Sequence, residues 1–159
     1  MNLKASALAV GILGAGVFFM SAQEPTPAGI FTLAQAEAGR AASEQTCGKC
    51  HTPALLGRKG QPGELPPIAS LSASYQEFIG PRGLVPPLAG KTFIDRWGAK
   101  TAAQLIARFQ ETADYFLPKD ADRETTVNIT AYVLQLNGAK PGNRPLTRTT
   151  DVIVNSVTR

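Results

Sequence analysis

The chain of 159 residues has few side chains that bind soft or borderline metal ions: two cysteines, one histidine and two methionines. Met1 and Met20 both belong to the N-terminal segment. Cys47, Cys50 and His51 lie together in the run Cys-Gly-Lys-Cys-His. A site built from several histidines is therefore excluded, and one pentapeptide holds every thiol and imidazole of the chain.

The spacing C-x-x-C-H is typical of covalent haem c attachment. Cys47 and Cys50 would each bond a vinyl group of one haem c, and the imidazole of His51 would be the proximal ligand of the iron. Three alternatives are less favourable. A zinc ion is poorly enclosed by three ligands from one short segment, a thioredoxin-like pair should follow a strand, and a short disulfide leaves the adjacent histidine unexplained.

The N-terminus has the order of a secretory signal. Lys4 precedes an apolar run from Ala5 to Met20, and a polar segment with prolines follows. We therefore expect residues 1–28 to be a leader that is cut between Ala22 and Ala28, and the mature protein to be periplasmic. If the leader is not cut, its apolar run reaches the lower limit of roughly 17 residues for crossing a bilayer, so a membrane-anchored form stays open.

About 130 residues remain after the leader, which is the size of one small domain. Its aliphatic core would be small because glycine and proline are frequent, and a buried porphyrin would supply apolar surface. The formal charge of +4 is modest. It gives no reason to expect nucleic-acid binding.

Apolar periodicity predicts an all-α domain over residues 29–142 with three main helices. The first begins at the N-cap Thr32 and carries the cysteine motif at its end. The second begins at Thr101, where the T-x-x-Q pattern predicts a capping box, and ends at 117–118. The third, capped by Asp120 or Asp122, ends at 137–138. Residues 52–90 are predicted to be an irregular loop with one short helix at 72–79, and residues 143–159 a surface or partly disordered tail.

Three segments together resemble a class I c-type cytochrome, and the chain is similar to the single-domain cytochromes found beside periplasmic dehydrogenases. They are TLAQAEAGRAASEQTCGKCH, VPPLAGKTFIDRWG and ITAYVLQLNG, and the resemblance covers Phe31 to Gly142. It implies the cytochrome c fold, in which three main helices surround the covalent haem and a long irregular loop follows the haem edge.

The resemblance also implies roles for particular residues. The carbonyl of a loop proline would accept a hydrogen bond from the proximal histidine, and Pro87 is the predicted residue, with Pro67 in the similar LPPIAS segment as its competitor. Trp97 would donate its indole N–H to a haem propionate. The first and last helices would cross where Gly39 meets the ring of Tyr132.

The sixth iron ligand departs from the family pattern, because Leu117 stands where the family typically has methionine. The distal side is then empty, bound by water, or filled by Lys119 or Tyr115, each of which must first lose a proton.

Two functions follow from this departure. The first is a monohaem carrier of single electrons, not an independent enzyme, whose partner is a periplasmic redox protein such as a dehydrogenase or terminal oxidase. The alternative is a five-coordinate haem protein that binds NO, CO, O2 or peroxide. A structural haem protein within a larger complex is a third possibility.

Overall fold

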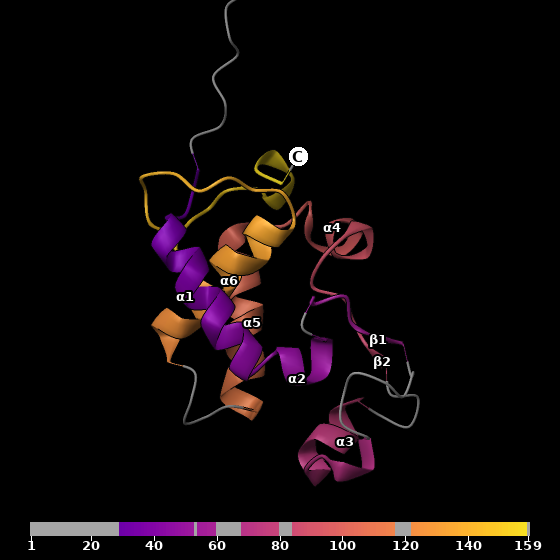
Figure 1. The fold of residues 1–159 in the computed structure, drawn as a ribbon. Helices are drawn as coiled ribbons and strands as arrows, with labels where there is room; N and C mark the ends of the chain where they lie inside the picture. The colour runs from indigo at the N-terminus through magenta and orange to yellow at the C-terminus, as the bar shows by residue number, and fades with distance from the viewer. Residues whose placement is uncertain (1–28, 53, 60–67, 80–83, 117–121, 159) are drawn as a thin grey trace, which may run out of the picture.

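A computed structural model describes residues 29–52, 54–59, 68–79, 84–116 and 122–158. This part of the chain is mostly helical, as predicted, and none of its helices is long and apolar enough to cross a membrane (Figure 1). The predicted leader, Pro67, Leu117 and Lys119 lie outside the described residues. In chain order the elements are α1 (Leu33–Gln45), α2 (Gly48–His51), β1 (Arg58–Lys59), η1 (Ile68–Ser70), α3 (Ala73–Ile79), β2 (Leu84–Val85), α4 (Lys91–Trp97), α5 (Ala102–Phe116), α6 (Arg123–Leu136) and η2 (Val154–Ser156).

The three long helices begin where the sequence predicts. Thr32 Oγ1 accepts from the backbone N–H of Gln35 at 3.2 Å, and the Gln35 side chain accepts from the backbone N–H of Thr32 at 3.2 Å. Thr101 and Gln104 form the same reciprocal pair before α5, at 3.0 and 3.3 Å. Asp122, one of the two predicted caps of α6, accepts from the N–H of Thr125 at 2.7 Å. Each cap satisfies helix N–H groups that lack an intrahelical partner.

Helices α1 and α6 cross at Gly39, whose lack of a side chain permits the contact. A Cβ placed on Gly39 would lie 1.8 Å from the carbonyl oxygen of Asn128 and 2.8 Å from the nitrogen of Ile129. Glycine at the crossing is thus confirmed. The atoms nearest to that Cβ belong to the backbone of α6.

Buried apolar side chains of α1, α5 and α6 form one core. Figure 1 shows these three helices side by side, with α3 and the β1–β2 pair at the periphery. Leu105 of α5 and Leu134 of α6 are fully buried. Large residues outside the three helices also join this core, among them Phe93 of α4 and Leu55 of the segment after α2.

Most of residues 143–158 are exposed, which agrees with the predicted surface tail, but the segment is anchored to the core and is not disordered. Leu146 and Val154 are buried, with 2% and 0% of their surface exposed. The first free N–H groups of α5 donate to this segment, Ala102 to the carbonyl of Val152 at 2.9 Å and Ala103 to that of Thr150 at 3.0 Å. The segment therefore completes the core and caps α5. Because most of its residues are polar, the sequence did not indicate that Leu146 and Val154 are buried.

The stretch from 52 to 90 agrees in part with the predicted loop. The expected short helix is present as α3, and β1 pairs antiparallel with β2, Arg58 opposite Val85. Helix α4, which follows this stretch, was not predicted. It begins after Gly90, whose φ is +82°, and it buries Phe93. Tertiary burial therefore decides this helix, because seven residues are too few to be stable alone.

Candidate functional site

The cysteine motif occupies a single helical turn directly after α1. Cys47 is the N-cap of α2, and the N–H of His51 donates to its carbonyl at 2.8 Å. Residues three and four positions apart share one face of a helix, so Cys50 and His51 lie on the same side as Cys47. Neither cysteine is in a disulfide.

Two of the alternatives from the sequence find no support in this geometry. The motif follows a helix, whereas a thioredoxin-like pair should follow a strand. Among the described residues, no three His, Cys, Asp or Glu side chains are grouped so that they could hold a metal ion.

The imidazole of His51 is held by a backbone carbonyl. Its Nδ1 lies 2.7 Å from the carbonyl oxygen of Pro86. Because a carbonyl can only accept, Nδ1 carries the hydrogen and Nε2 keeps its lone pair. Burial lowers the pKa of His51, and the hydrogen bond to Pro86 partly opposes this. The ring is therefore neutral near pH 7, which is the form that binds a metal.

Pro86 was missed by the sequence analysis, which selected the next residue, Pro87. Val85 and Pro86 each precede a proline, and this restricts both to extended conformations. Successive carbonyls of an extended chain point to opposite sides, so only one of the two proline carbonyls can face the imidazole. The accepting carbonyl is therefore one residue earlier than predicted. As predicted, it belongs to a proline of the VPPLAG segment.

Contacts on both sides of Pro86 hold it against the motif. The N–H of Gly57 donates to the carbonyl of His51 at 2.9 Å, and that of Leu88 donates to Leu55 at 2.8 Å. Asn137 at the end of α6 donates to the carbonyl of Leu88 at 3.0 Å and accepts from the N–H of Gly90 at 3.0 Å. The last helix therefore fixes the segment that orients the histidine.

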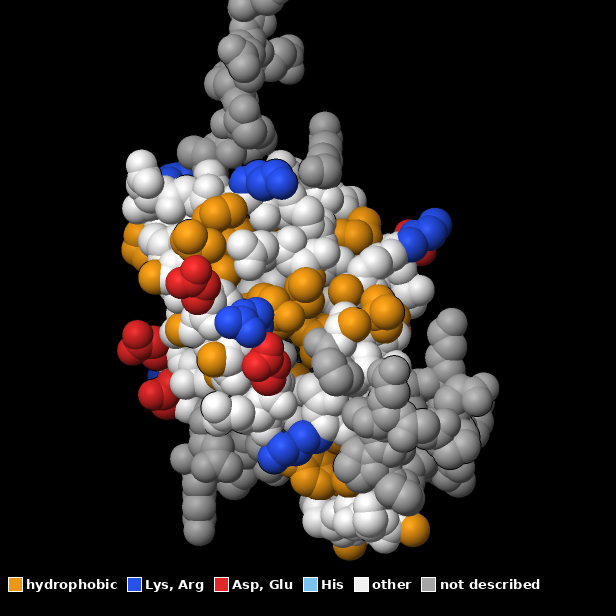
Figure 2. Space-filling model, in the orientation of Figure 1, with side chains coloured by type: hydrophobic (Ala, Val, Ile, Leu, Met, Phe, Trp, Pro, Cys, Tyr) orange, Lys and Arg blue, Asp and Glu red, His pale blue; other side chains and the backbone are white. Residues whose placement is uncertain are grey.

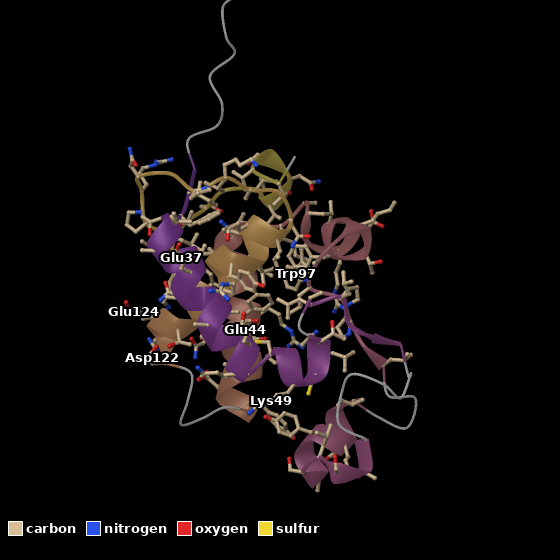
Figure 3. All side chains as sticks on the ribbon, in the orientation of Figure 1. Glu37, Glu44, Lys49, Trp97, Asp122 and Glu124 are labelled. Carbon is tan, nitrogen blue, oxygen red and sulfur yellow. The ribbon has the colours of Figure 1, made fainter. Side chains whose placement is uncertain are left out.

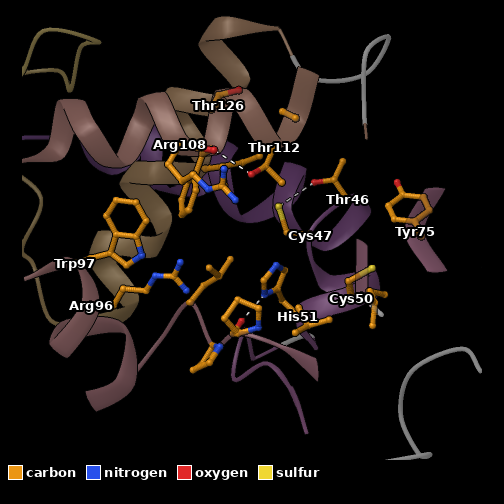
Figure 4. Close-up of a pocket in the computed structure, with 18 of the residues that line it drawn as sticks. Thr46, Cys47, Cys50, His51, Tyr75, Arg96, Trp97, Arg108, Thr112 and Thr126 are labelled. Atoms are coloured by element: carbon orange, nitrogen blue, oxygen red, sulfur yellow. Dashed lines mark hydrogen bonds between the residues drawn. The ribbon is translucent and has the colours of Figure 1, made fainter. Parts of the chain in front are cut away.

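The motif opens onto a cleft with about 1220 Å³ of empty space, part of it open to solvent (Figure 4). Cys47, Cys50 and His51 all line it. The wall is contributed by α3, α4, α5, α6 and the segment after β2, and it is mainly apolar. Its hydrophobic residues include Ile79, Val85, Pro87, Leu88, Phe109 and Ile129.

The thiol of Cys47 is partly buried. Burial raises its pKa, and the neighbouring hydroxyl of Thr46, whose Oγ1 lies 3.5 Å from Sγ, partly opposes this. The Thr46 hydroxyl also donates to the carbonyl of Ala42 at 2.7 Å. The thiol is therefore protonated near neutral pH and sits in a mainly apolar setting.

The charged side chains that line the cleft are all positive. Arg96 and Arg108 line it, and no aspartate or glutamate is among its described lining residues. Figure 3 places Glu37 and Glu44 on α1 and Glu124 at the start of α6, away from Trp97 at the cleft. Figure 2 shows charged side chains scattered over one face, with hydrophobic ones gathered at its centre.

Two other predicted residues have different positions. Trp97 lines the cleft and is half-buried, with Lys100 Nζ 6.0 Å from its ring centroid. Tyr115 is 60% exposed and is not among the lining residues, so the structure does not bring it to His51.

The sequence analysis also missed Arg96 and Arg108. A usable signal existed for Arg108, because it lies three residues after the core residue Leu105 and next to Phe109, and this spacing places it beside the buried face of α5.

The site thus combines two thiols, an oriented imidazole with a free lone pair, apolar walls and two guanidinium groups. Such a cleft suits a flat apolar group that carries negative charge at its edge. No family model matches the chain, and no curated protein or solved structure is significantly similar to it.

Proposed function

We propose that the chain is a monohaem c-type cytochrome of class I that carries single electrons to or from a redox partner. Cys47 and Cys50 would hold one haem c through thioether bonds, and Nε2 of His51 would be the proximal iron ligand. The observation that supports this best is the 2.7 Å contact between His51 Nδ1 and the carbonyl of Pro86. It leaves Nε2 available in the cleft that both cysteines line.

The residues of the cleft fit haem. Its mainly apolar walls match the porphyrin face, and the positive charge of Arg96 matches a propionate. Arg96 and Trp97, adjacent on α4, would hold a propionate through a guanidinium and an indole N–H. When bound, haem supplies a one-electron couple at its iron.

The chain's own residues then have definite tasks. Pro86 fixes the ring orientation of His51 and makes Nε2 a stronger base by accepting the Nδ1 hydrogen. Phe109 and Ile129 exclude water from part of the cleft, and exclusion of water raises the reduction potential of a buried haem by disfavouring its more positive state. The open side of the cleft would leave an edge accessible to an electron-transfer partner.

The location and partner belong to the same proposal. Residues 1–28 have the order of a secretory leader, so the protein would act in the periplasm, or at the membrane if the leader is retained. The partner would be a periplasmic redox protein, such as a dehydrogenase or terminal oxidase. We propose a carrier or a dehydrogenase subunit, not an independent enzyme and not a nucleic-acid-binding protein.

Expression of the full chain in a bacterium that attaches haem c tests this directly. The purified protein is denatured and stained for haem on a gel, and the pyridine haemochrome spectrum is recorded. We expect covalent haem in the wild type and in the control Lys49→Ala, which alters α2 but neither thiol. A double Cys47→Ala, Cys50→Ala variant should release all haem on denaturation. Haem-free wild type from this host would contradict the proposal.

A second function, a five-coordinate haem protein that binds a small ligand at an open distal site, is favoured by the donor inventory. His51 is the only histidine of the chain, and the only methionines are Met1 and Met20. Among the described residues that line the cleft, no second imidazole or thioether is present. High-spin ferric iron and rapid CO uptake by the reduced protein would support this function, whereas low-spin iron without a CO shift would support the pure carrier.

A further inference from the structure

Helix α5 forms the wall of the cleft that faces His51. Arg108, Phe109 and Thr112 contribute to this wall. Figure 4 shows Arg108 and Thr112 across the cleft from His51, whose Nδ1 is turned toward Pro86. Because the two ring nitrogens of imidazole point to opposite sides, Nε2 is directed toward the α5 wall. A ligand bound opposite His51 would therefore meet α5.

Arg108 can donate hydrogen bonds to a group in the cleft. One of its terminal nitrogens, Nη1, lies 3.3 Å from a carboxylate oxygen of Glu111, and both side chains of this pair are largely exposed. A guanidinium has five N–H donors, so most of them remain for other partners. Arg108 also lines the cleft, where its guanidinium projects toward the interior (Figure 4).

Thr112 of α5 and Thr126 of α6, which also line the cleft, are poor hydrogen-bond donors to a ligand. The hydroxyl of Thr112 donates to the carbonyl of Arg108 at 3.0 Å, and that of Thr126 donates to the carbonyl of Asp122 at 3.1 Å. Each hydroxyl has one hydrogen, and here it is used within the helix. On this wall, Arg108 is therefore the side chain with both a positive charge and available donors.

We propose that Arg108 makes the position opposite His51 selective for small anions over neutral ligands, an inference that rests on the proposed haem c. The positive charge of Arg108 stabilises an anion. Glu111 offsets only part of this charge, because the pair is solvent-exposed, and the described lining residues include no carboxylate. The class of ligand is a small monovalent anion, for which azide is the probe. This refines the open-site alternative, whose gaseous ligands are neutral.

The test is a titration of the purified ferric holoprotein with azide, followed by the absorption spectrum. We expect Arg108→Leu to lower the azide association constant roughly tenfold to a hundredfold, as for loss of one charge-assisted hydrogen bond. Arg108→Lys should retain part of the affinity because it keeps the charge. Neutral imidazole, titrated in parallel, should bind the wild type and Arg108→Leu within a factor of about two to three, since it gains little from the cation.

Arg40→Leu is the matched control. Arg40 also pairs with a glutamate on an exposed helix face, at 2.9 Å from Glu44, and it does not line the cleft. Its loss removes the same formal charge, so an equal fall in azide affinity in both variants would show a general field effect and overturn the proposal. Azide affinity unchanged in Arg108→Leu would also overturn it, and would point instead to a propionate as the partner of Arg108.

Failure of the underlying function has a different signature. If the wild type carries covalent haem but binds no azide, the haem assignment stands and the anion-selective site is wrong. If the wild type carries no covalent haem, both proposals are wrong. Haem staining tests the proposed function, and the azide titration tests the anion-selective site, so the two outcomes can be told apart on one sample.

Discussion

Replacement of Gly39 by alanine is the most direct test of how α1 and α6 pack. The added Cβ would lie 1.8 Å from the carbonyl oxygen of Asn128, 2.3 Å from its carbonyl carbon and 2.8 Å from the nitrogen of Ile129. All three atoms belong to the backbone of α6, so no side chain can rotate away. The two helices would have to separate by more than an ångström to restore a normal contact, on the order of the difference between 1.8 Å and an ordinary separation of about 3.5 Å.

The expected magnitude follows from two opposing effects. Alanine is favoured over glycine in a helix interior by about 1 kcal/mol. Overpacking of a tight core commonly costs about 1–3 kcal/mol, and a backbone clash belongs at or beyond the upper end. We therefore expect Gly39→Ala to lower the free energy of unfolding by roughly 2 kcal/mol or more, a substantial part of the ~5–15 kcal/mol of a typical domain.

Urea denaturation of the purified protein, followed by far-ultraviolet circular dichroism, measures this change through the midpoint and the m-value. Gly48→Ala is the matched control: it is also helical, and its Cβ would meet the carbonyl oxygen of Ser43 at 3.4 Å, an ordinary contact. This control should be neutral or slightly stabilising. A Gly39→Ala variant as stable as the control would refute the close approach of the helices.

Three further predictions concern the site, the C-terminal segment and pH. Gly57→Ala should lower the midpoint of urea denaturation, because φ is +80° there and its Cβ would lie 2.5 Å from the carbonyl oxygen of Val85, next to Pro86. With the proposed haem c attached, its absorption spectrum should change as well, and an unchanged spectrum would argue against this support of His51. Val154→Ala should cost about 2 kcal/mol by emptying a buried position, whereas its exposed neighbour Ile153→Ala should be nearly neutral in the same assay, and equal effects would contradict an ordered tail. The N–H of Thr125 holds the pKa of Asp122 below its ordinary 3.8, so the cap contributes its full stabilisation above pH 3.8 and loses it as the pH falls through the folded-state pKa. The difference in free energy of unfolding between the wild type and Asp122→Ala should therefore shrink on acidification. A difference that does not depend on pH would refute this.

Features that depend on neighbours within one helical turn could be read from the sequence. The caps at Thr32, Thr101 and Asp122 each join residues three positions apart, and all three are present in the structure. The end of α6 also follows local rules, with Asn137 at the C-cap and Gly138 at a φ of +95°. The C-x-x-C-H run is also local. Its residues form a single helical turn that needs no contact with distant segments to be recognised.

Only the tertiary structure decided the features that join distant segments. Pro86 instead of Pro87 faces His51 because β1–β2 pairing and the end of α6 set the position of an extended segment 35 residues away from the motif. The ordered C-terminal segment depends on α5, whose free N–H groups it receives, and a polar composition gives no sign of that. Arg108 reaches the cleft because α5 packs beside α6.

The two groups of features differ for a physical reason. Hydrogen bonds within a helical turn are specified by adjacent side chains, so motif and caps are written in short runs of residues. Contacts across the fold depend on which surfaces the whole chain can bury together, and no short run contains that information. The sequence alone therefore determined the donor set of this protein, whereas the tertiary structure decided which carbonyl orients the imidazole and which cation faces it.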